Sequence, residues 1–233
     1  MAITTFAAID VGSYSVCMNG YEMSKRTGIR QIDEIRHRLE IGKDTYGKGK
    51  ISFETARELC RILKDFSEIM KGYQVADYRA CATSTLQEAE NVWIVLEQVY
   101  QKTGIQVEIL SNSEQRFFGY KSVASKETSF AKMIQKGTAI IEIGGGNVQI
   151  SLFDKDALVT TQSFMLGSLR IRELLLPVEK EAIHYEQMVE ELVHNQILGF
   201  KKLHLKERKA EHIILLGNTF IERMLEKQGS LQE

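Results

Sequence analysis

Proline is almost absent from this chain, because Pro177 is the single one among 233 residues. With no low-complexity tract either, the sequence does not favour long disordered linkers. An apolar run of about 18 residues, the length that a transmembrane helix needs, is also missing, so no membrane partner is expected. The N-terminus lacks a basic start and reaches Asp10 early, which does not fit a secretory signal peptide.

Cysteine is scarce as well, and the three present, Cys17, Cys60 and Cys81, are widely spaced. An odd, scattered set favours reduced thiols in a cytoplasmic protein over a disulfide framework or a zinc site. Neither sign of charge dominates, since 30 lysines and arginines stand against 31 aspartates and glutamates. This balance argues against a protein that mainly coats nucleic acid, so no nucleic-acid partner is expected.

What the chain does contain is a glycine-rich stretch from Ile140 to Ile150. Alternating apolar residues run through Glu142 into three consecutive glycines, and a second alternation follows, which predicts strand, tight turn and strand. Glycines leave backbone N–H groups uncovered by a Cβ, so an anion can approach them closely. Glu142 could hold a cation against that anion. An ordinary hairpin turn that needs positive φ is the alternative interpretation.

A second copy of this arrangement spans Phe6 to Ser15. There an apolar strand ends on Asp10, turns through Gly12 and Ser13, and is followed by another apolar strand. Two such hairpins, far apart in sequence, predict two related half-domains that face one another. A phosphate and a metal ion are expected between them.

The order of elements predicts an α/β fold. Strands are expected at 3–10, 16–23, 29–39, 75–83 and 105–110, and helices at 52–72, at 84–102 with Ser84 as its N-cap, and at 111–125. Residues 40–50, rich in glycine and lysine, are expected to be a flexible polar loop. Their spacing nearly matches a P-loop, but Gly49 stands where that motif needs Ser or Thr. The second part repeats the order, with strands at 137–143, 147–154, 157–163 and 212–216 and helices at 168–176, 179–203 and 219–228.

This duplicated order resembles the ribonuclease-H-like double domain of the actin, Hsp70 and sugar-kinase superfamily. Lobe I is expected at 1–125, a polar hinge at 126–136 and lobe II at 137–233. The second lobe ends one strand and one helix short of the first. We therefore expect a fragment, or a natural short form of a longer protein.

Six segments stand out in order along nearly the whole chain: Asp10–Ser15, Ala82–Gln87, Ser111–Arg116, Glu142–Gln149, Gly167–Arg170 and Gly217–Thr219. Together they resemble the motifs of the exopolyphosphatase and guanosine pentaphosphate phosphohydrolase family. In the same order, those motifs are Asp-x-Gly-Ser-Asn-Ser, Ala-Thr-Ser-Ala-x-Arg, Ser-Gly-x-Glu-Glu-Ala, Asp-Ile-Gly-Gly-Gly-Ser-x-Glu, Gly-Ser-x-Arg and Gly-Gly-Thr. Departures from the pattern include Tyr14, Gln87, Glu142, Asn147, Gln149 and Asn218. Gln87 in place of Arg forfeits a charge-assisted contact to phosphate worth about 1.5–3 kcal/mol.

The resemblance implies hydrolysis of the terminal phosphoanhydride bond of inorganic polyphosphate or guanosine pentaphosphate, with magnesium or manganese as cofactor. It implies Glu114 as the base that deprotonates the attacking water. It implies metal binding at Asp10, Glu142 and Gln149. It also implies phosphate binding at Gly12, Ser13, Ser15, Gly144, Gly145, Gly146, Asn147 and Arg170.

Simpler interpretations stay open at several of these positions. Glu114 could complete a capping box with Ser111, Asp10 could be a turn residue, and Arg170 a solvated helix residue. The departures also fit a catalytically impaired member that binds polyphosphate or a phosphorylated nucleotide without turnover. A sugar or acetate kinase fits less well, because the second half is short for an adenosine pocket. Whether the chain forms a homodimer stays open.

Overall fold

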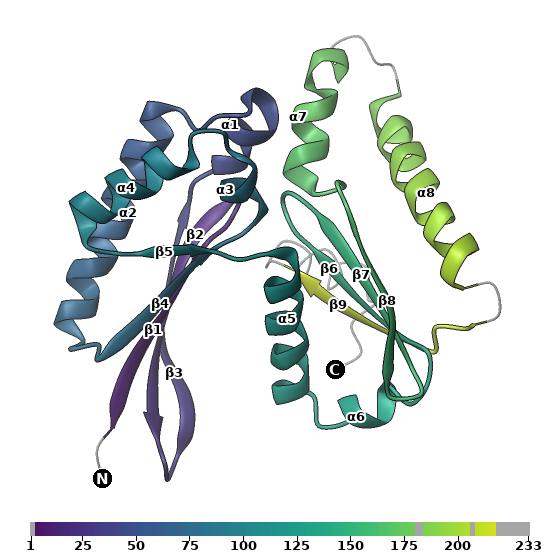
Figure 1. The fold of residues 1–233 in the computed structure, drawn as a ribbon, viewed down its shortest axis with the longest axis horizontal. Helices are drawn as coiled ribbons and strands as arrows, with labels where there is room; N and C mark the ends of the chain where they lie inside the picture. Colours follow the sequence, from purple (N-terminus) through teal and green to yellow (C-terminus); the bar gives the residue numbers. More distant parts are fainter. Residues whose placement is uncertain (1–2, 180–183, 206–207, 218–233) are drawn as a thin grey trace. The chain divides into compact units, whose positions relative to one another are not determined.

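The computed structural model describes residues 3–179, 184–205 and 208–217, and it divides into two compact units, residues 1–115 (unit 1) and 116–233 (unit 2). Each unit is built on one mixed β-sheet with helices beside it (Figure 1). The elements of unit 1 are β1 (Thr4–Val11), β2 (Ser15–Ser24), β3 (Gly28–Arg38), α1 (Ile41–Lys48), α2 (Phe53–Gly72), β4 (Asp77–Ala82), α3 (Ser84–Glu88), α4 (Val92–Thr103) and β5 (Val107–Ile109). The next helix, α5 (Asn112–Lys126), begins in the last residues of unit 1 and continues in unit 2.

Unit 2 continues with seven further elements in its described residues. They are α6 (Phe130–Met133), β6 (Thr138–Ile143), β7 (Val148–Asp154), β8 (Ala157–Phe164), α7 (Ser168–Glu179), α8 (Tyr185–His204) and, as the last, β9 (His212–Gly217). The segment expected as a hinge contains α6, and a hinge role there stays a prediction. The helix expected at 219–228 lies outside the described residues. None of the helices in the described part of the chain is both long and apolar enough to cross a lipid bilayer.

The two sheets repeat one topology, as the sequence predicts. The strand order is β3-β2-β1-β4-β5 in unit 1 and β8-β7-β6-β9 in the described part of unit 2. In both, the first strand pairs antiparallel with the second and parallel with the fourth. The expected duplicated α/β fold is therefore confirmed, and β6 to β9 correspond to β1 to β4.

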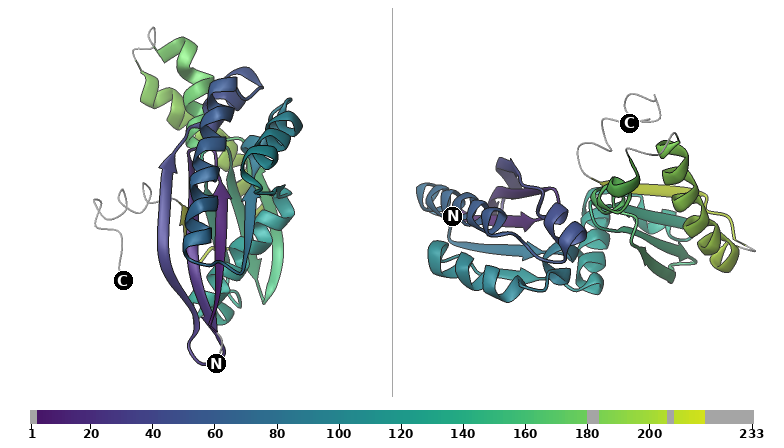
Figure 2. Two further views of the ribbon diagram at one scale, coloured as in Figure 1. Left: turned by 90° about the vertical axis from the view of Figure 1, so that its left-hand side faces the viewer. Right: turned by 90° about the horizontal axis from the view of Figure 1, so that it is seen from above.

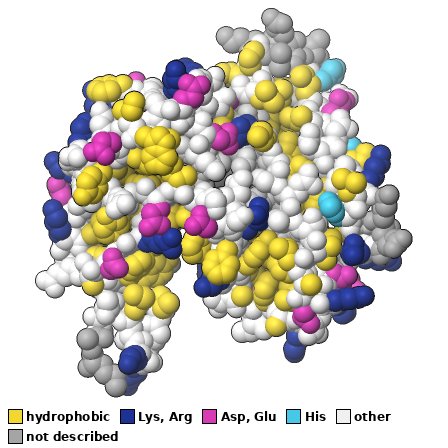
Figure 3. Space-filling model, in the orientation of Figure 1, with side chains coloured by type: hydrophobic (Ala, Val, Ile, Leu, Met, Phe, Trp, Pro, Cys, Tyr) yellow, Lys and Arg dark blue, Asp and Glu magenta, His cyan; other side chains and the backbone are white. Residues whose placement is uncertain are grey.

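The core of unit 1 lies between its sheet and the two helices α2 and α4 (Figure 2). The apolar positions of α2 recur every three or four residues, so one face of this helix is buried while the other is charged. Ser52 caps the start of α2, because its hydroxyl accepts a hydrogen bond from the Thr55 N–H at 3.2 Å. The outer face of α4 is different, since Trp93 and Ile94 are 73% and 71% exposed. Figure 3 shows hydrophobic side chains gathered on the surface of unit 1.

The expectation of a flexible loop at 40–50 is wrong, because α1 occupies most of it. Ile41 is fully buried, and the carboxylate of Asp44 accepts hydrogen bonds from the Ser52 N–H at 2.9 Å and the Thr55 hydroxyl at 2.6 Å. Gly49 then ends the helix with a φ of 72°. The glycines and lysines indicate a loop, but the contacts of this segment with residues further along the chain stabilise a helix.

The prediction of a single helix at 84–102 is also wrong. The chain forms α3 and α4 with a break at 89–91, where the side chain of Asn91 donates to the Ile51 carbonyl at 2.8 Å and accepts from the Ile51 N–H at 3.0 Å. Ser84 is not the N-cap. Thr83 holds that position and makes no side-chain capping bond, whereas Ser84 is buried.

Candidate functional site

The two acid–glycine hairpins have the same turn geometry. In unit 1 the Gly12 N–H donates to the Ser15 carbonyl at 3.0 Å, and in unit 2 the Gly144 N–H donates to the Asn147 carbonyl at 2.9 Å. The last strand pairs before the turns are Val11 with Val16 and Ile143 with Val148. Each turn therefore spans four residues, and the two copies align position by position.

This alignment places the two acids at equivalent positions, one strand residue before the closing pair. Asp10 lies opposite Cys17, and Glu142 lies opposite Gln149. Asp10 is exposed, whereas Cys17 is buried, and burial raises the pKa of its thiol. The cross-strand partner of the acid is therefore a neutral thiol in unit 1 and a neutral amide in unit 2.

The glycine turn of unit 2 is fixed from behind by the start of α7. The Ser168 N–H donates to the Gly144 carbonyl at 3.2 Å, and the Leu169 N–H donates to the Gly145 carbonyl at 2.9 Å. The Gly146 carbonyl accepts from the Arg170 Nε at 2.8 Å. Arg170 is thus not an ordinary solvated helix residue, because its side chain holds the turn.

The opposite side of the same turn carries backbone donors. Among the described residues, the N–H groups of Gly145 and Gly146 find no acceptor, while the carbonyls of both residues are bonded. A turn whose carbonyls are held inward and whose N–H groups stay available is suited to bind an anion. Asn147 and Arg170 lie at the same turn, so unit 2 brings all of its predicted phosphate-binding residues together.

The turn of unit 1 is fixed by backbone and hydroxyl groups. The Gly42 N–H, in α1, donates to the Ser13 carbonyl at 3.0 Å. The Ser13 hydroxyl is buried in a cluster, where it bonds to Thr85 and, at 3.0 Å, to the Tyr46 hydroxyl. Tyr46 also bonds to Ser84 at 3.2 Å. The Ala82–Gln87 motif therefore supports this turn, a role that the sequence did not reveal because Tyr46 lies in the supposed loop.

Glu114 forms the capping box that the sequence also allowed. Its carboxylate accepts hydrogen bonds from the Ser111 N–H at 2.9 Å and the Ser111 hydroxyl at 2.8 Å, and its own N–H donates to that hydroxyl at 3.3 Å. These bonds from Ser111 lower the pKa of Glu114. The carboxylate is thus exposed, ionised and positioned at the start of α5, and its catalytic role stays a prediction.

A small polar pocket lies within unit 2, between α5 and the sheet. Its lining residues come from four elements and are Arg116, Gly119, Tyr120, Ile140, Glu142, Gln149, Ser151 and Leu216. The Tyr120 hydroxyl donates to the Ser151 hydroxyl at 2.7 Å, which ties the helix to β7. Gln149 is only 2% exposed, and neither atom of its amide has a hydrogen-bond partner among the described residues.

This pocket does not suit a divalent cation. Magnesium and manganese need several oxygen ligands, among which carboxylates dominate. Here a single carboxylate, that of Glu142, and the neutral amide of Gln149 share the lining with the guanidinium-bearing Arg116. In the described part of the chain, no group of three or more His, Cys, Asp or Glu side chains is placed to hold a metal ion.

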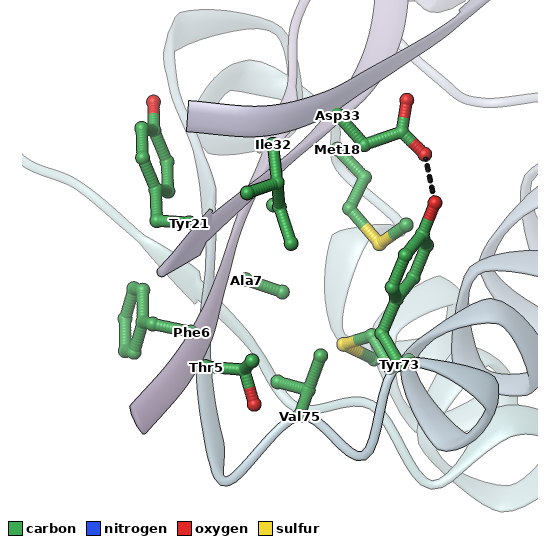
Figure 4. Close-up of a pocket in the computed structure, with 11 residues that line it drawn as sticks. Thr5, Phe6, Ala7, Met18, Tyr21, Ile32, Asp33, Tyr73 and Val75 are labelled. Atoms are coloured by element: carbon green, nitrogen blue, oxygen red, sulfur yellow. Dashed lines mark hydrogen bonds between the residues drawn. The ribbon is translucent and has the colours of Figure 1, made fainter. Parts of the chain in front are cut away.

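A second pocket, in unit 1, lies near the start of β1, at the end of the sheet away from the glycine turn. Figure 4 shows the residues that line it. The lining is mainly apolar, with Phe6, Met18, Met70 and Val75 among its residues. The one hydrogen bond drawn there runs from the Tyr73 hydroxyl to Asp33, at 2.9 Å. None of the predicted site residues lines this pocket, so it is separate from the glycine turn of unit 1.

Comparison with known proteins gives a consistent result. The model of the Ppx/GppA phosphatase family matches residues 22–233. Exopolyphosphatase 1 of Mycobacterium tuberculosis is 25% identical over 169 residues, which cover 72% of this chain and 48% of that protein. The guanosine-5'-triphosphate,3'-diphosphate pyrophosphatase of Vibrio parahaemolyticus is 25% identical over 152 residues, or 62% of this chain and 28% of that protein.

A solved structure agrees with these relatives. The crystal structure of an exopolyphosphatase from Cytophaga hutchinsonii superposes with a TM-score of 0.79 at 18% identity, over 99% of this chain and 73% of that one. At 18% identity, this structural similarity shows that the two proteins share a fold. The chain spans about half or less of the length of the two curated relatives.

Proposed function

The chain belongs to the Ppx/GppA phosphatase family, and on that premise we propose that it binds and hydrolyses the terminal phosphate of inorganic polyphosphate or guanosine pentaphosphate. The observation that carries the proposal is the turn of unit 2, where the N–H groups of Gly145 and Gly146 have no acceptor among the described residues. Backbone donors of this kind suit the closely spaced oxygens of a phosphate chain. The names of the two curated relatives specify the same class of substrate.

The remaining predicted residues have complementary roles in this proposal. Gly12 and Ser15 belong to the equivalent turn of unit 1, and Ser13 anchors that turn through its buried hydroxyl. Arg170 holds the Gly146 carbonyl and so anchors the glycine turn to α7. In this proposal the backbone donors of the unit 2 turn bind and orient the phosphate.

Glu114 is proposed as the general base. It would accept a proton from water as the water oxygen attacks the terminal phosphorus, and the bond to the bridging oxygen would break. The products are inorganic phosphate and a ligand shortened by one phosphate. The carboxylate of Glu114 is ionised at neutral pH, but its lowered pKa makes it a weaker base, and the capping bonds from Ser111 must yield before it can act.

The family resemblance adds magnesium or manganese, held by Asp10, Glu142 and Gln149. When bound, such an ion would neutralise charge that develops on the phosphate oxygens. Asp10 offers an exposed carboxylate. The pocket that contains Glu142 and Gln149, however, supplies a single carboxylate, which is too few oxygen ligands for a divalent ion. We therefore assign no step of the proposed reaction to a metal ion.

The second candidate function is binding of the same ligands without turnover. It is favoured by the amide of Gln149, which replaces a carboxylate of the family pattern, and by Gln87, which replaces an arginine. Neither change removes the glycine N–H groups. Affinity for phosphate could therefore persist after the chemistry is lost.

Phosphate release from long-chain polyphosphate and from guanosine pentaphosphate tests both candidates. The assay compares the unmodified protein with Glu114→Gln, in magnesium, in manganese and with a chelator. Glu127→Gln is the matched control, because Glu127 is another exposed carboxylate bonded to a neighbouring serine, at 2.6 Å to the Ser129 hydroxyl. We expect Glu114→Gln alone to abolish turnover while binding measured by calorimetry stays nearly unchanged.

The other outcomes separate the candidates. Equal turnover in the unmodified protein and Glu114→Gln would show that Glu114 only caps α5. Binding without phosphate release in every metal would favour the second candidate. A folded protein that neither binds nor hydrolyses these ligands would contradict the proposed function.

A further inference from the structure

The pocket under α5 contains a cationic side chain where the family resemblance calls for a metal ion. Arg116 is half-buried and lines this pocket together with Glu142 and Gln149. The helix that carries Arg116 is held to the sheet, since Tyr120 bonds to Ser151 at 2.7 Å and packs edge-on against the Phe153 ring at 5.2 Å. The position of Arg116 beside the two β-strand residues is therefore set by packing.

Two departures from the family motifs meet in this pocket, and both change its charge in the same direction. Arg116 stands where the Ser-Gly-x-Glu-Glu-Ala motif has alanine, which adds one positive charge. Gln149 stands where the glycine motif has glutamate, which removes one negative charge. A pocket with two carboxylates is neutralised by a divalent cation, whereas the present pocket, with Glu142 and Arg116, is already neutral.

We infer that Arg116 takes the place of a divalent cation in this pocket, so that the Glu142 and Gln149 end of the site excludes magnesium and manganese. A guanidinium has a permanent positive charge and only hydrogen-bond donors, so it repels a metal ion and competes for the Glu142 carboxylate. The neutral amide of Gln149 cannot offset that repulsion as a carboxylate would. The inference goes beyond the proposed function and does not depend on turnover.

The decisive experiment measures manganese binding by electron paramagnetic resonance on the full chain. The variants are Arg116→Ala, Gln149→Glu and the double variant, and circular dichroism confirms that each is folded. We expect no manganese binding that depends on Glu142 in the unmodified protein, and at least a tenfold gain in affinity in the double variant. Adding Glu142→Gln to the double variant should abolish that gain.

A matched control removes a neighbouring cation from the same helix. Lys121 lies over the Phe117 ring, with its Nζ 4.7 Å from the centroid, and does not line the pocket. Lys121→Ala combined with Gln149→Glu should bind manganese no better than Gln149→Glu alone. The inference is overturned if the unmodified protein binds manganese and Glu142→Gln removes that binding. A folded double variant that still binds no manganese would overturn it too.

Discussion

The backbone of Gly167 lies directly against that of Gly146, with the Gly167 N–H donating to the Gly146 carbonyl at 3.2 Å. A Cβ built on Gly167 would lie closer than 3.0 Å to backbone atoms of both Gly145 and Gly146. No flexible side chain is available there to move aside. The close approach of α7 to the glycine turn therefore requires glycine at this position.

We accordingly expect Gly167→Ala to displace the turn or the start of α7 and to destabilise unit 2. Overpacking of this kind costs about 1–3 kcal/mol. The measurement is urea unfolding, combined with the affinity for polyphosphate. Gly199→Ala is the control, because nothing lies within 4 Å of a Cβ at that exposed helical glycine, and it should stabilise α8. Equal urea concentrations at the midpoint of unfolding for Gly167→Ala and the unmodified protein would contradict the prediction.

The buried amide of Gln149 predicts a gain in stability when it is removed. Both of its polar atoms lack a partner in the described structure, and an unsatisfied buried group costs about 1–3 kcal/mol. Gln149→Met has nearly the same shape and no hydrogen-bonding group, so the free energy of unfolding should rise by a similar amount. Gln162→Met, on the half-buried neighbouring strand, is the comparison. A loss of stability in Gln149→Met alone would show that the amide has a bound partner.

Asp44 should make the stability of unit 1 depend on acid pH. Burial by itself raises the pKa of its carboxyl. The hydrogen bonds from Ser52 and Thr55 and the charge of Lys48 together lower that pKa by more than burial raises it, so the net shift is downward. The stabilisation is therefore present above the ordinary pKa of 3.8 and is lost as the pH falls through the lowered value. Asp44→Ala should cost about 1–3 kcal/mol at pH 7, because two half-buried donors, the Ser52 N–H and the Thr55 hydroxyl, lose their acceptor.

The measurement for Asp44 is thermal unfolding between pH 2 and pH 7. The difference in melting temperature between the unmodified protein and Asp44→Ala should shrink as the pH falls. A difference that is the same at pH 2 and pH 7 would show that the carboxylate charge does not matter.

The capping box predicts a titration that Ser111 controls. The hydrogen bonds from the backbone N–H and, to a smaller degree, the hydroxyl of Ser111 lower the pKa of Glu114. Alanine keeps the N–H and loses the hydroxyl, so Ser111→Ala should raise that pKa only part of the way toward its ordinary value. Carboxyl-carbon NMR of the two proteins measures the shift directly. Because the pKa is lowered in the folded state, the cap fully stabilises α5 above the ordinary pKa, and this stabilisation is lost as the pH falls through the lowered value. An unchanged pKa in Ser111→Ala would mean that the Ser111 hydroxyl does not bond to the Glu114 carboxylate in solution.

Local patterns in the sequence were sufficient for much of the architecture. The apolar alternation on either side of Gly144–Gly146 predicts β6 and β7, and the repeat at Asp10–Ser15 predicts the duplicated topology that the two sheets share. The Ser111 to Glu114 spacing predicts the capping box. These features depend on residues only a few positions apart, so the chain itself contains the information that forms them.

The tertiary structure decided the features that depend on distant residues. The bonds between Asp44 and Ser52 make a helix of a segment that looks like a loop, and the pairing of Asn91 with Ile51 breaks one expected helix into two. Likewise, only the packing of α5 on β6 and β7 places Arg116 in the pocket with Gln149. The sequence shows both substitutions, but their combined effect on charge exists only where folding brings their side chains into one pocket.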